Sequence, residues 1–272
     1  MTTWYLLRDL KPRPGAENMA VDRHLLELTE QGLVDAPVLR LYAWSTPTLS
    51  LGYHQQWRRT VDKEALTRHG VDLVRRWTGG RGVLHDFDEI TYAVIAKMAA
   101  PFSTRLKQNY RLIGEALEDF TRLDTSPATL VRDGERPEEV RRNRHLPCFA
   151  SLGESEIEKG GRKLIGSSQK LGRNAFLQHG SIPLVHRTRV LEEITGTQVQ
   201  MEGYMTSLEE HYAAADLPLP PRAALLDRLS TCFARRFGIS FRPISELGYP
   251  DEAEVARITD ACFGQDEWTF RK

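Results

Sequence analysis

The sequence predicts an α+β fold with a mixed, largely antiparallel sheet and surrounding helices. Two observations point to this class: β-rich runs and amphipathic runs share the chain, and they do not follow the strict βαβ alternation of a doubly wound parallel sheet. The composition, 40% hydrophobic and 27% charged, is that of a globular protein able to bury a sizeable core.

The first third of the chain is expected to form one strand, a two-stranded hairpin and two helices. TWYLLRDL is typical of a strand, and Gly15 opens a helix that ends at Gly32, with one apolar face. That face contains Met19, Leu25, Leu26 and Leu28. VLRLYAW and TLSLGY, joined by the turn residues 45–47, are expected to pair as a hairpin. The short helix DKEALTRHG follows and is closed by Gly70.

The remainder is expected to continue this mixture. VDLVRR, VLHD and EITYAVIA are β-like, and Ser103 is placed to cap a long helix through NYRLIGEALEDFTRL. The Arg- and Pro-rich residues 124–145 resemble a variable connection. EIEKGGRKLIGSSQK and NAFLQHGSIPL return to strand, with a tight turn at Gly160-Gly161. A helix is expected within residues 220–238, opened by proline and ended by Gly238.

Charge and cysteine content exclude several classes. The 37 basic and 37 acidic side chains cancel, so nothing favours nucleic-acid or membrane binding by the whole molecule. Three distant cysteines, Cys148, Cys232 and Cys262, do not form a disulfide framework, and none has metal-ligand spacing with a histidine. With no signal-like N-terminus and no apolar run of transmembrane length, a cytoplasmic protein is expected.

The densest candidate site is the stretch RRWTGGRGVLHD. Its glycines allow the backbone to approach a ligand, and its arginines can pair with phosphate. The same pattern is equally typical of a glycine turn between strands with solvated arginines. No Walker lysine or dinucleotide-binding fingerprint accompanies it.

Two further candidates are Lys163 and Cys148. Lys163 lies in GRKLIGSSQ, and the pattern alone favours a solvated lysine in a strand. Cys148 follows basic residues that favour a thiolate, namely Arg141, Arg142, Arg144 and His145, although a lone cysteine is more often buried and inert. Cys232 and Cys262 fit that inert description, since each lies in an amphipathic run beside a phenylalanine.

Together these blocks resemble the lipoate-protein ligase and octanoyltransferase superfamily. RRWTGGRGVLHD resembles its glycine-rich signature, GRKLIGSSQ its lysine motif and LQHGSI the strand that follows. AENMAVD, LRLYAWSTPTLSLGY and DEWTFRK extend the likeness over nearly the whole chain. Cys148-Phe149 upstream of Lys163 is most similar to the cysteine-dependent octanoyltransferases of Gram-positive bacteria. The resemblance implies a catalytic domain like that of biotin and lipoate protein ligases, with an acyl tunnel.

The resemblance also implies a mechanism. Cys148 would take octanoyl from an acyl carrier protein as a thioester and pass it to a lysine of a lipoyl-domain protein such as the glycine cleavage H protein. Lys163 would lower the pKa of the Cys148 thiol and donate a hydrogen bond to the oxyanion. No cofactor would be needed. The remaining expected site residues would bind substrate: Arg76, Thr78, Gly79, Gly80, Arg81, Gly82, His85, Gly166, Ser167, Gln169, His179 and Gly180. For His85 and His179 a structural, hydrogen-bonded role is the open alternative. Arg141, Arg142 and Arg144 are candidates for docking the acidic carrier.

Two other activities remain open at this point. One is an ATP- and Mg-dependent lipoate or octanoate ligase; the other is an amidotransferase that moves octanoyl between lipoyl-domain proteins. Arg81 stands where ligases usually have glycine, and the chain stops at Lys272 without room for the C-terminal accessory domain of many ligases. A single catalytic domain over residues 1–272, acting as a monomer, is therefore expected. The sequence does not define the acyl chain length or the acceptor.

Overall fold

A computed structural model describes residues 2–123, 128–130 and 156–271. Its main sheet has eight strands in the order β11-β1-β2-β6-β10-β9-β8-β7. Their bounds are β1 Thr2–Arg13, β2 Val38–Trp44, β6 Glu89–Lys97, β7 Thr129–Leu130, β8 Ile157–Lys159, β9 Arg162–Leu171, β10 Ala175–Pro183 and β11 Ile239–Pro243. β1 pairs in parallel with β2 and β11, and every other neighbouring pair in this sheet is antiparallel. The expected mixed, largely antiparallel sheet is confirmed.

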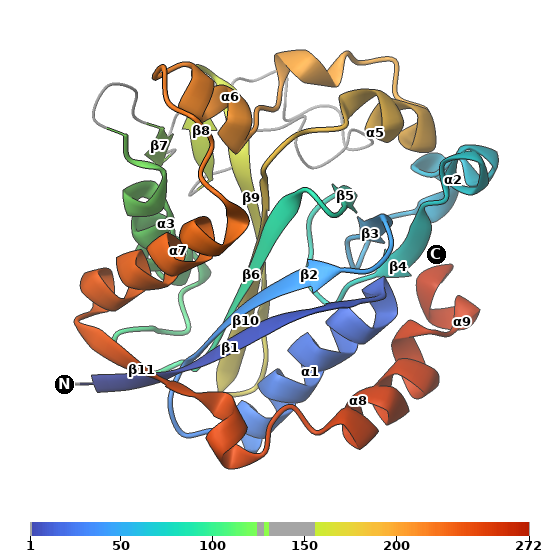
Figure 1. The fold of residues 1–272 in the computed structure, drawn as a ribbon. Coiled ribbons are helices and arrows are strands. Elements are labelled where there is room, and N and C mark those ends of the chain that lie inside the picture. Colours follow the sequence, from blue (N-terminus) through green and yellow to red (C-terminus); the bar gives the residue numbers. More distant parts are fainter. Residues whose placement is uncertain (1, 124–127, 131–155, 272) are drawn as a thin grey trace.

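Helices cover both faces of this sheet (Figure 1). Their bounds are α1 Gly15–Gln31, α2 Lys63–His69, α3 Leu106–Thr121, α5 Thr188–Thr195, α6 Leu208–Ala213, α7 Arg222–Phe237, α8 Glu252–Ile258 and α9 Asp266–Thr269. Alternate residues of β6 point to opposite faces: Tyr92 and Val94 join the core beneath α3 and α7, whereas Ala93 and Ile95 join the core beneath α1 and α8. None of the described helices is long and apolar enough to cross a membrane.

Glycine ends several helices as the sequence predicts. Gly32, Gly70 and Gly238 follow α1, α2 and α7 in the left-handed backbone region, where glycine lacks the steric penalty of a β-carbon. Gly160 and Gly161 both have positive φ in the turn between β8 and β9, which matches the expected tight turn. The expected apolar face of α1 is buried in the core.

Two local expectations are wrong. β2 does not form a hairpin with β3 (Thr48–Leu51), because both edges of β2 are already taken by β1 and β6. β3 instead lies between β4 (Asp72–Arg75) and β5 (Val83–His85) in a separate three-stranded sheet. Ser103 does not cap α3, which begins after Arg105; the Ser103 hydroxyl accepts the Arg105 N–H in the preceding turn.

Candidate active site

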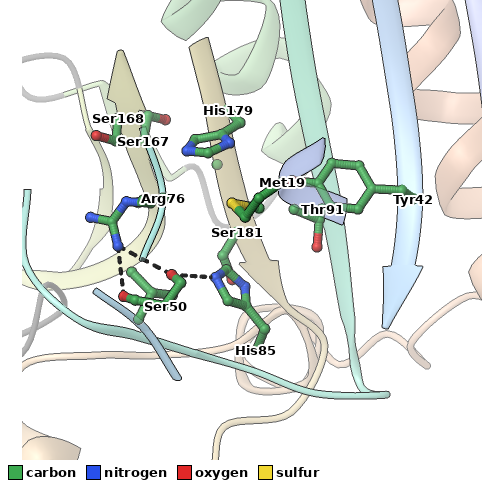
Figure 2. A pocket seen from close by; sticks show the side chains of 13 residues that line it. Met19, Tyr42, Ser50, Arg76, His85, Thr91, Ser167, Ser168, His179 and Ser181 are labelled. Carbon is green, nitrogen blue, oxygen red and sulfur yellow. Dashed lines mark hydrogen bonds between the residues drawn. The ribbon is translucent and has the colours of Figure 1, made fainter. Parts of the chain in front are cut away.

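A pocket lies where the small sheet meets the ends of β6, β9 and β10. It encloses about 360 Å³, part of which is open to solvent. Its lining combines small and polar side chains with a few apolar ones (Figure 2): Met19, Tyr42, Ser50, Arg76, Val83, His85, Thr91, Gly166, Ser167, Ser168, His179, Gly180 and Ser181. Six of the predicted substrate-binding residues therefore line one cavity. We call it the inner pocket.

The predicted glycine loop joins β4 to β5 and borders the inner pocket. Arg76, which is almost fully buried, holds it. Its guanidinium donates to the carbonyls of Gly79 and Arg81 at 2.7 and 2.8 Å, to Thr78 Oγ1 at 3.0 Å, and to the carbonyl and hydroxyl of Ser50 at 2.7 and 3.1 Å. Five N–H groups thus serve five protein acceptors. The sequence suggested that this arginine pairs with phosphate, whereas here it organises the loop.

His179 on β10 connects the loop to a buried carboxylate. Its Nδ1 is 2.8 Å from Asp22 Oδ2 and its Nε2 is 2.7 Å from Thr78 Oγ1. Because a carboxylate only accepts, Nδ1 carries the proton, and Nε2 of the neutral ring accepts the Thr78 hydroxyl. Burial lowers the pKa of His179, which favours this neutral form.

His85 on β5 makes a second connection of the same design. Its Nδ1 donates to the buried Glu89 carboxylate at 2.8 Å, and its Nε2 is 2.9 Å from Ser50 Oγ, which also accepts from Arg76. Figure 2 shows this series from Arg76 through Ser50 to His85. Trp44 stacks on the His85 ring at 4.1 Å. Both histidines are hydrogen-bonded on both ring nitrogens, as the structural role considered in the sequence analysis requires. The hydrogen bonds from His179 through Thr78 and from His85 through Ser50 both lead to Arg76.

Buried charges anchor the His179 series. Arg40, with no exposed surface, donates to Asp22 and to Asp9, each at 2.7 Å. Asp9 in turn accepts from Arg13. Burial by itself would raise the pKa of Asp22, but Arg40 and His179 hold it below its ordinary value. Asp22 therefore remains an anion, which fixes the tautomer of His179.

The β9 side of the pocket presents hydroxyl and amide groups. Ser167 Oγ lies 2.7 Å from the Tyr92 hydroxyl, and Ser168 Oγ donates to the Gly79 carbonyl at 2.7 Å. Gln178 Nε2 donates to Tyr92 at 3.2 Å and its Oε1 accepts from Gln169 at 3.0 Å. Ser168 therefore connects the glycine loop directly to the strand that carries the lysine motif.

Lys163 is not the solvated lysine that its pattern alone favours. It lies on β9 with no exposed surface, and its ammonium pairs with the buried carboxylate of Glu156. Its backbone N–H and C=O are bonded to Tyr204 and Thr206. Burial raises the pKa of Tyr92, which is hydrogen-bonded to Ser167, to about 12, and the negative charge of Glu156 adds to this rise. Glu156 is therefore close enough to Tyr92 to interact with it electrostatically.

The other predicted residues lie in a second cleft, in the packing beside Leu49, or outside the described residues. Gly80 and Arg81 line an outer cleft on the far side of the glycine loop, together with His54 and Arg59. Gly82 packs beside Leu49. Cys148 and the basic residues Arg141, Arg142, Arg144 and His145 lie outside the described residues. Cys232 and Cys262 are buried, and burial raises the pKa of both thiols, as inert cysteines require.

Sequence reasoning missed four residues that support the site: Asp22, Ser50, Glu89 and Glu156. A signal existed for two of them. Asp22 closes the block AENMAVD, and Glu89 stands four residues after His85. For Ser50 and Glu156 only the three-dimensional structure supplies the partner.

Gly52 permits the close contact between the small sheet and the glycine loop. A β-carbon at Gly52 would overlap the Gly80 carbonyl oxygen and lie against the Gly79 backbone. We expect Gly52→Ala to lower the free energy of unfolding by about 1–3 kcal/mol and the catalytic rate at least ~10-fold, because the loop backbone must shift. Thermal unfolding and steady-state rates measure both. Gly203→Ala, where a β-carbon meets no atom within 4 Å, is the control; equal behaviour of the two variants would contradict this packing role.

Comparison with known proteins agrees with the fold. Residues 14–218 match the lipoyl protein ligase A/B catalytic domain. Among solved structures, a lipoate-protein ligase A bound with ATP superimposes with a TM-score of 0.80 at 21% identity, covering 99% of both chains. A putative lipoate protein ligase from T. acidophilum with bound lipoic acid superimposes with a TM-score of 0.78 at 20% identity, covering 99% of this chain and 100% of that one. At these identities the likeness shows the fold.

The sequence relatives are closer. The octanoyltransferase LipM of Kyrpidia tusciae is 36% identical over 279 residues, covering 100% of both chains, and that of Staphylococcus aureus is 33% identical over 264 residues, covering 94% of each. The fold and the family match define a lipoyl protein ligase A/B catalytic domain. The chain belongs to the octanoyltransferase members of that family. The resemblance inferred from the motifs is thus confirmed.

Proposed function

We propose that this protein transfers octanoyl from an acyl carrier protein to the lysine of a lipoyl-domain protein, such as the glycine cleavage H protein, through a thioester on Cys148. The names of the full-length relatives support octanoyl transfer over the ATP-dependent ligase reaction. The observation on this chain that carries the proposal is the buried Lys163–Glu156 pair, located on the strand that forms the pocket wall. We place the reaction in the cytoplasm.

The chemistry needs no nucleotide because the acyl group arrives activated. The Cys148 thiolate attacks the octanoyl carbonyl, and the carrier thiolate leaves. The carrier thiolate takes up the proton that the Cys148 thiol had released, and the acyl group is held on Cys148 as a thioester. The acceptor amine then attacks this thioester, the Cys148 thiolate leaves, and the amine proton is released. The first exchange conserves a thioester, and the second is downhill because an amide is more stable.

In this proposal Lys163 supplies a fixed positive charge. A buried ammonium costs free energy unless an anion compensates it, so Glu156 keeps the ammonium in one place on β9. Directed at the reacting carbonyl, it stabilises the oxyanion in both half-reactions; precedent values one such donor at about 3 kcal/mol. Gly166, Ser167 and Gly180 leave room for the acyl group in the inner pocket, because glycine and serine present little side chain to it.

We expect octanoyl-carrier protein, without nucleotide, to leave the mass of one octanoyl group on the intact enzyme, because the intermediate is covalent. Peptide mapping should place this group on Cys148. An adduct on Cys232 or Cys262, or product formation without any adduct, would remove the assigned nucleophile.

Two further arms of the experiment separate the remaining activities. Free octanoate with ATP and magnesium tests the ligase; efficient modification by Cys148→Ala under these conditions would replace our proposal with the ligase. Octanoylated H protein as donor tests the amidotransferase, which predicts faster transfer from that donor than from the carrier protein.

A further inference from the structure

A cation-rich surface lies on the outer side of the glycine loop, away from the inner pocket. It surrounds the outer cleft, whose lining, among the residues that the structure describes, includes Arg59, Arg81 and His54 and no acidic residue. Further cations continue this surface across neighbouring aromatic rings. We call the following set the cationic face: Arg58, Arg59, Lys63, Lys170 and Arg271, with the rings of Tyr53, Trp57, Trp77, Trp268 and Phe270.

Most of these cations lie on aromatic rings. Arg271 stacks on Tyr53 at 3.9 Å and on Trp268 at 3.7 Å, and Lys170 lies 5.5 Å from the Tyr53 ring. Lys63 lies 4.0 Å from the Phe270 ring, which packs against Trp57. The rings connect four of these cations across segments distant in the sequence, and Arg59, which lines the outer cleft, follows Arg58 in the chain.

Within the described residues, no carboxylate forms an ion pair with any of the five cations. The acids on the same segments are Asp62, which caps α2 through the Ala65 N–H, and the exposed Glu64, Asp266 and Glu267. An ion pair cancels charge, whereas an aromatic ring holds a cation in place without cancelling it. The five cations also outnumber the four carboxylates on these segments, so the cationic face keeps a net positive charge although the whole chain is formally neutral.

We propose that the cationic face docks the acidic acyl-carrier donor and that the outer cleft receives the phosphodiester of its acyl-bearing arm. This inference rests on the proposed function. The glycine loop borders both cavities: Gly80 lines the cleft, and the adjacent Gly79 carbonyl accepts a hydrogen bond from Ser168 of the pocket wall. An arm lying over this loop has a short path to the pocket.

Charge favours the donor over the acceptor as the occupant. The donor presents an anionic phosphodiester and an acidic surface, which a positive surface attracts and steers. The acceptor presents an ammonium group, which the same potential repels. The outer cleft is open to solvent and carries Arg59 and Arg81 in its lining, so it has both the room and the positive charge for a phosphodiester arm.

The test reverses two charges that line or flank the cleft. Arg59→Glu with Lys170→Glu is expected to raise KM for octanoyl-carrier protein about 10-fold or more, with little change in kcat, and to abolish the dependence of KM on salt. Transfer from octanoyl-N-acetylcysteamine, a small uncharged thioester, should keep its rate. The matched control is Lys97→Glu with Arg105→Glu, the same charge change at the opposite end of β6 and beside α3, which should leave KM for the carrier unchanged.

Each alternative result would contradict a different part of the proposal. Equal loss with both donors, together with a raised KM for the lipoyl domain, would show that the acceptor docks here. An unchanged KM for the carrier in Arg59→Glu with Lys170→Glu would show that the cationic face does not dock the carrier. No transfer from either donor by the unaltered protein would instead contradict the proposed function itself.

Discussion

Replacement of Arg76 by methionine is expected to lower the free energy of unfolding by about 3–5 kcal/mol and octanoyl transfer by at least ~100-fold. Five hydrogen bonds disappear together, and the carbonyls of Ser50, Gly79 and Arg81 lose a charged donor in a buried setting. Thr78 and Ser50 also lose the donor that orients their hydroxyls toward the two histidines. Equilibrium unfolding in urea and steady-state transfer rates measure both effects.

Arg75 offers a matched control for this substitution. It is equally buried and donates to five backbone carbonyls, but they belong to residues 52–55 and to the C-terminal residues Thr269 and Arg271. Arg75→Met should therefore lose comparable stability, while its folded fraction keeps clearly more of kcat than that of Arg76→Met. If the two variants lose kcat equally at equal folded fraction, the special role of Arg76 in ordering the glycine loop is wrong.

Arg76→Lys separates charge from geometry. The ammonium keeps the positive charge but offers three donors on a flexible stem, whereas the guanidinium offers five in a fixed plane. We therefore expect Arg76→Lys to recover only part of the stability and little of the transfer rate. Full recovery by lysine would show that charge alone holds the loop.

The sequence predicted those elements whose determinants are local. Gly32, Gly70 and Gly238 end their helices because a left-handed residue is required immediately after the last turn, and that requirement is visible in a few consecutive residues. The β2–β3 hairpin was predicted from the same kind of local signal and is wrong, because the pairing of β2 depends on β1 and β6, which are distant in the sequence.

The candidate site divides in the same way. The motifs identified six of the thirteen residues that line the inner pocket, since glycine, serine and histidine cluster in short stretches. They did not reveal that Arg76 is fully used by protein acceptors, because those acceptors come from β3 and from the loop itself. They also did not reveal the partner of Lys163, because Glu156 has no distinguishing neighbour in the sequence.

Lys163→Met and Glu156→Gln are each expected to lower the free energy of unfolding by about 3–5 kcal/mol, because each leaves the other charge buried without a partner. Combining the two substitutions removes both charges, and we expect the double variant to regain most of that stability. Alanine is less informative at Lys163, since a fully buried side chain would leave a cavity.

Octanoyl transfer should not return with stability in the double variant. If Lys163 supports the Cys148 thiolate and the oxyanion, a methionine removes both effects however well the protein folds, and transfer should stay at least ~100-fold below the unaltered enzyme. Alkylation of Cys148 followed against pH should also show a raised thiol pKa in Lys163→Met and in the double variant, with the buried Cys232 and Cys262 as internal references. A stable double variant that transfers octanoyl at a near-normal rate, with an unchanged Cys148 titration, would show that the Lys163–Glu156 pair is structural and leave Cys148 as the only catalytic residue of the proposal.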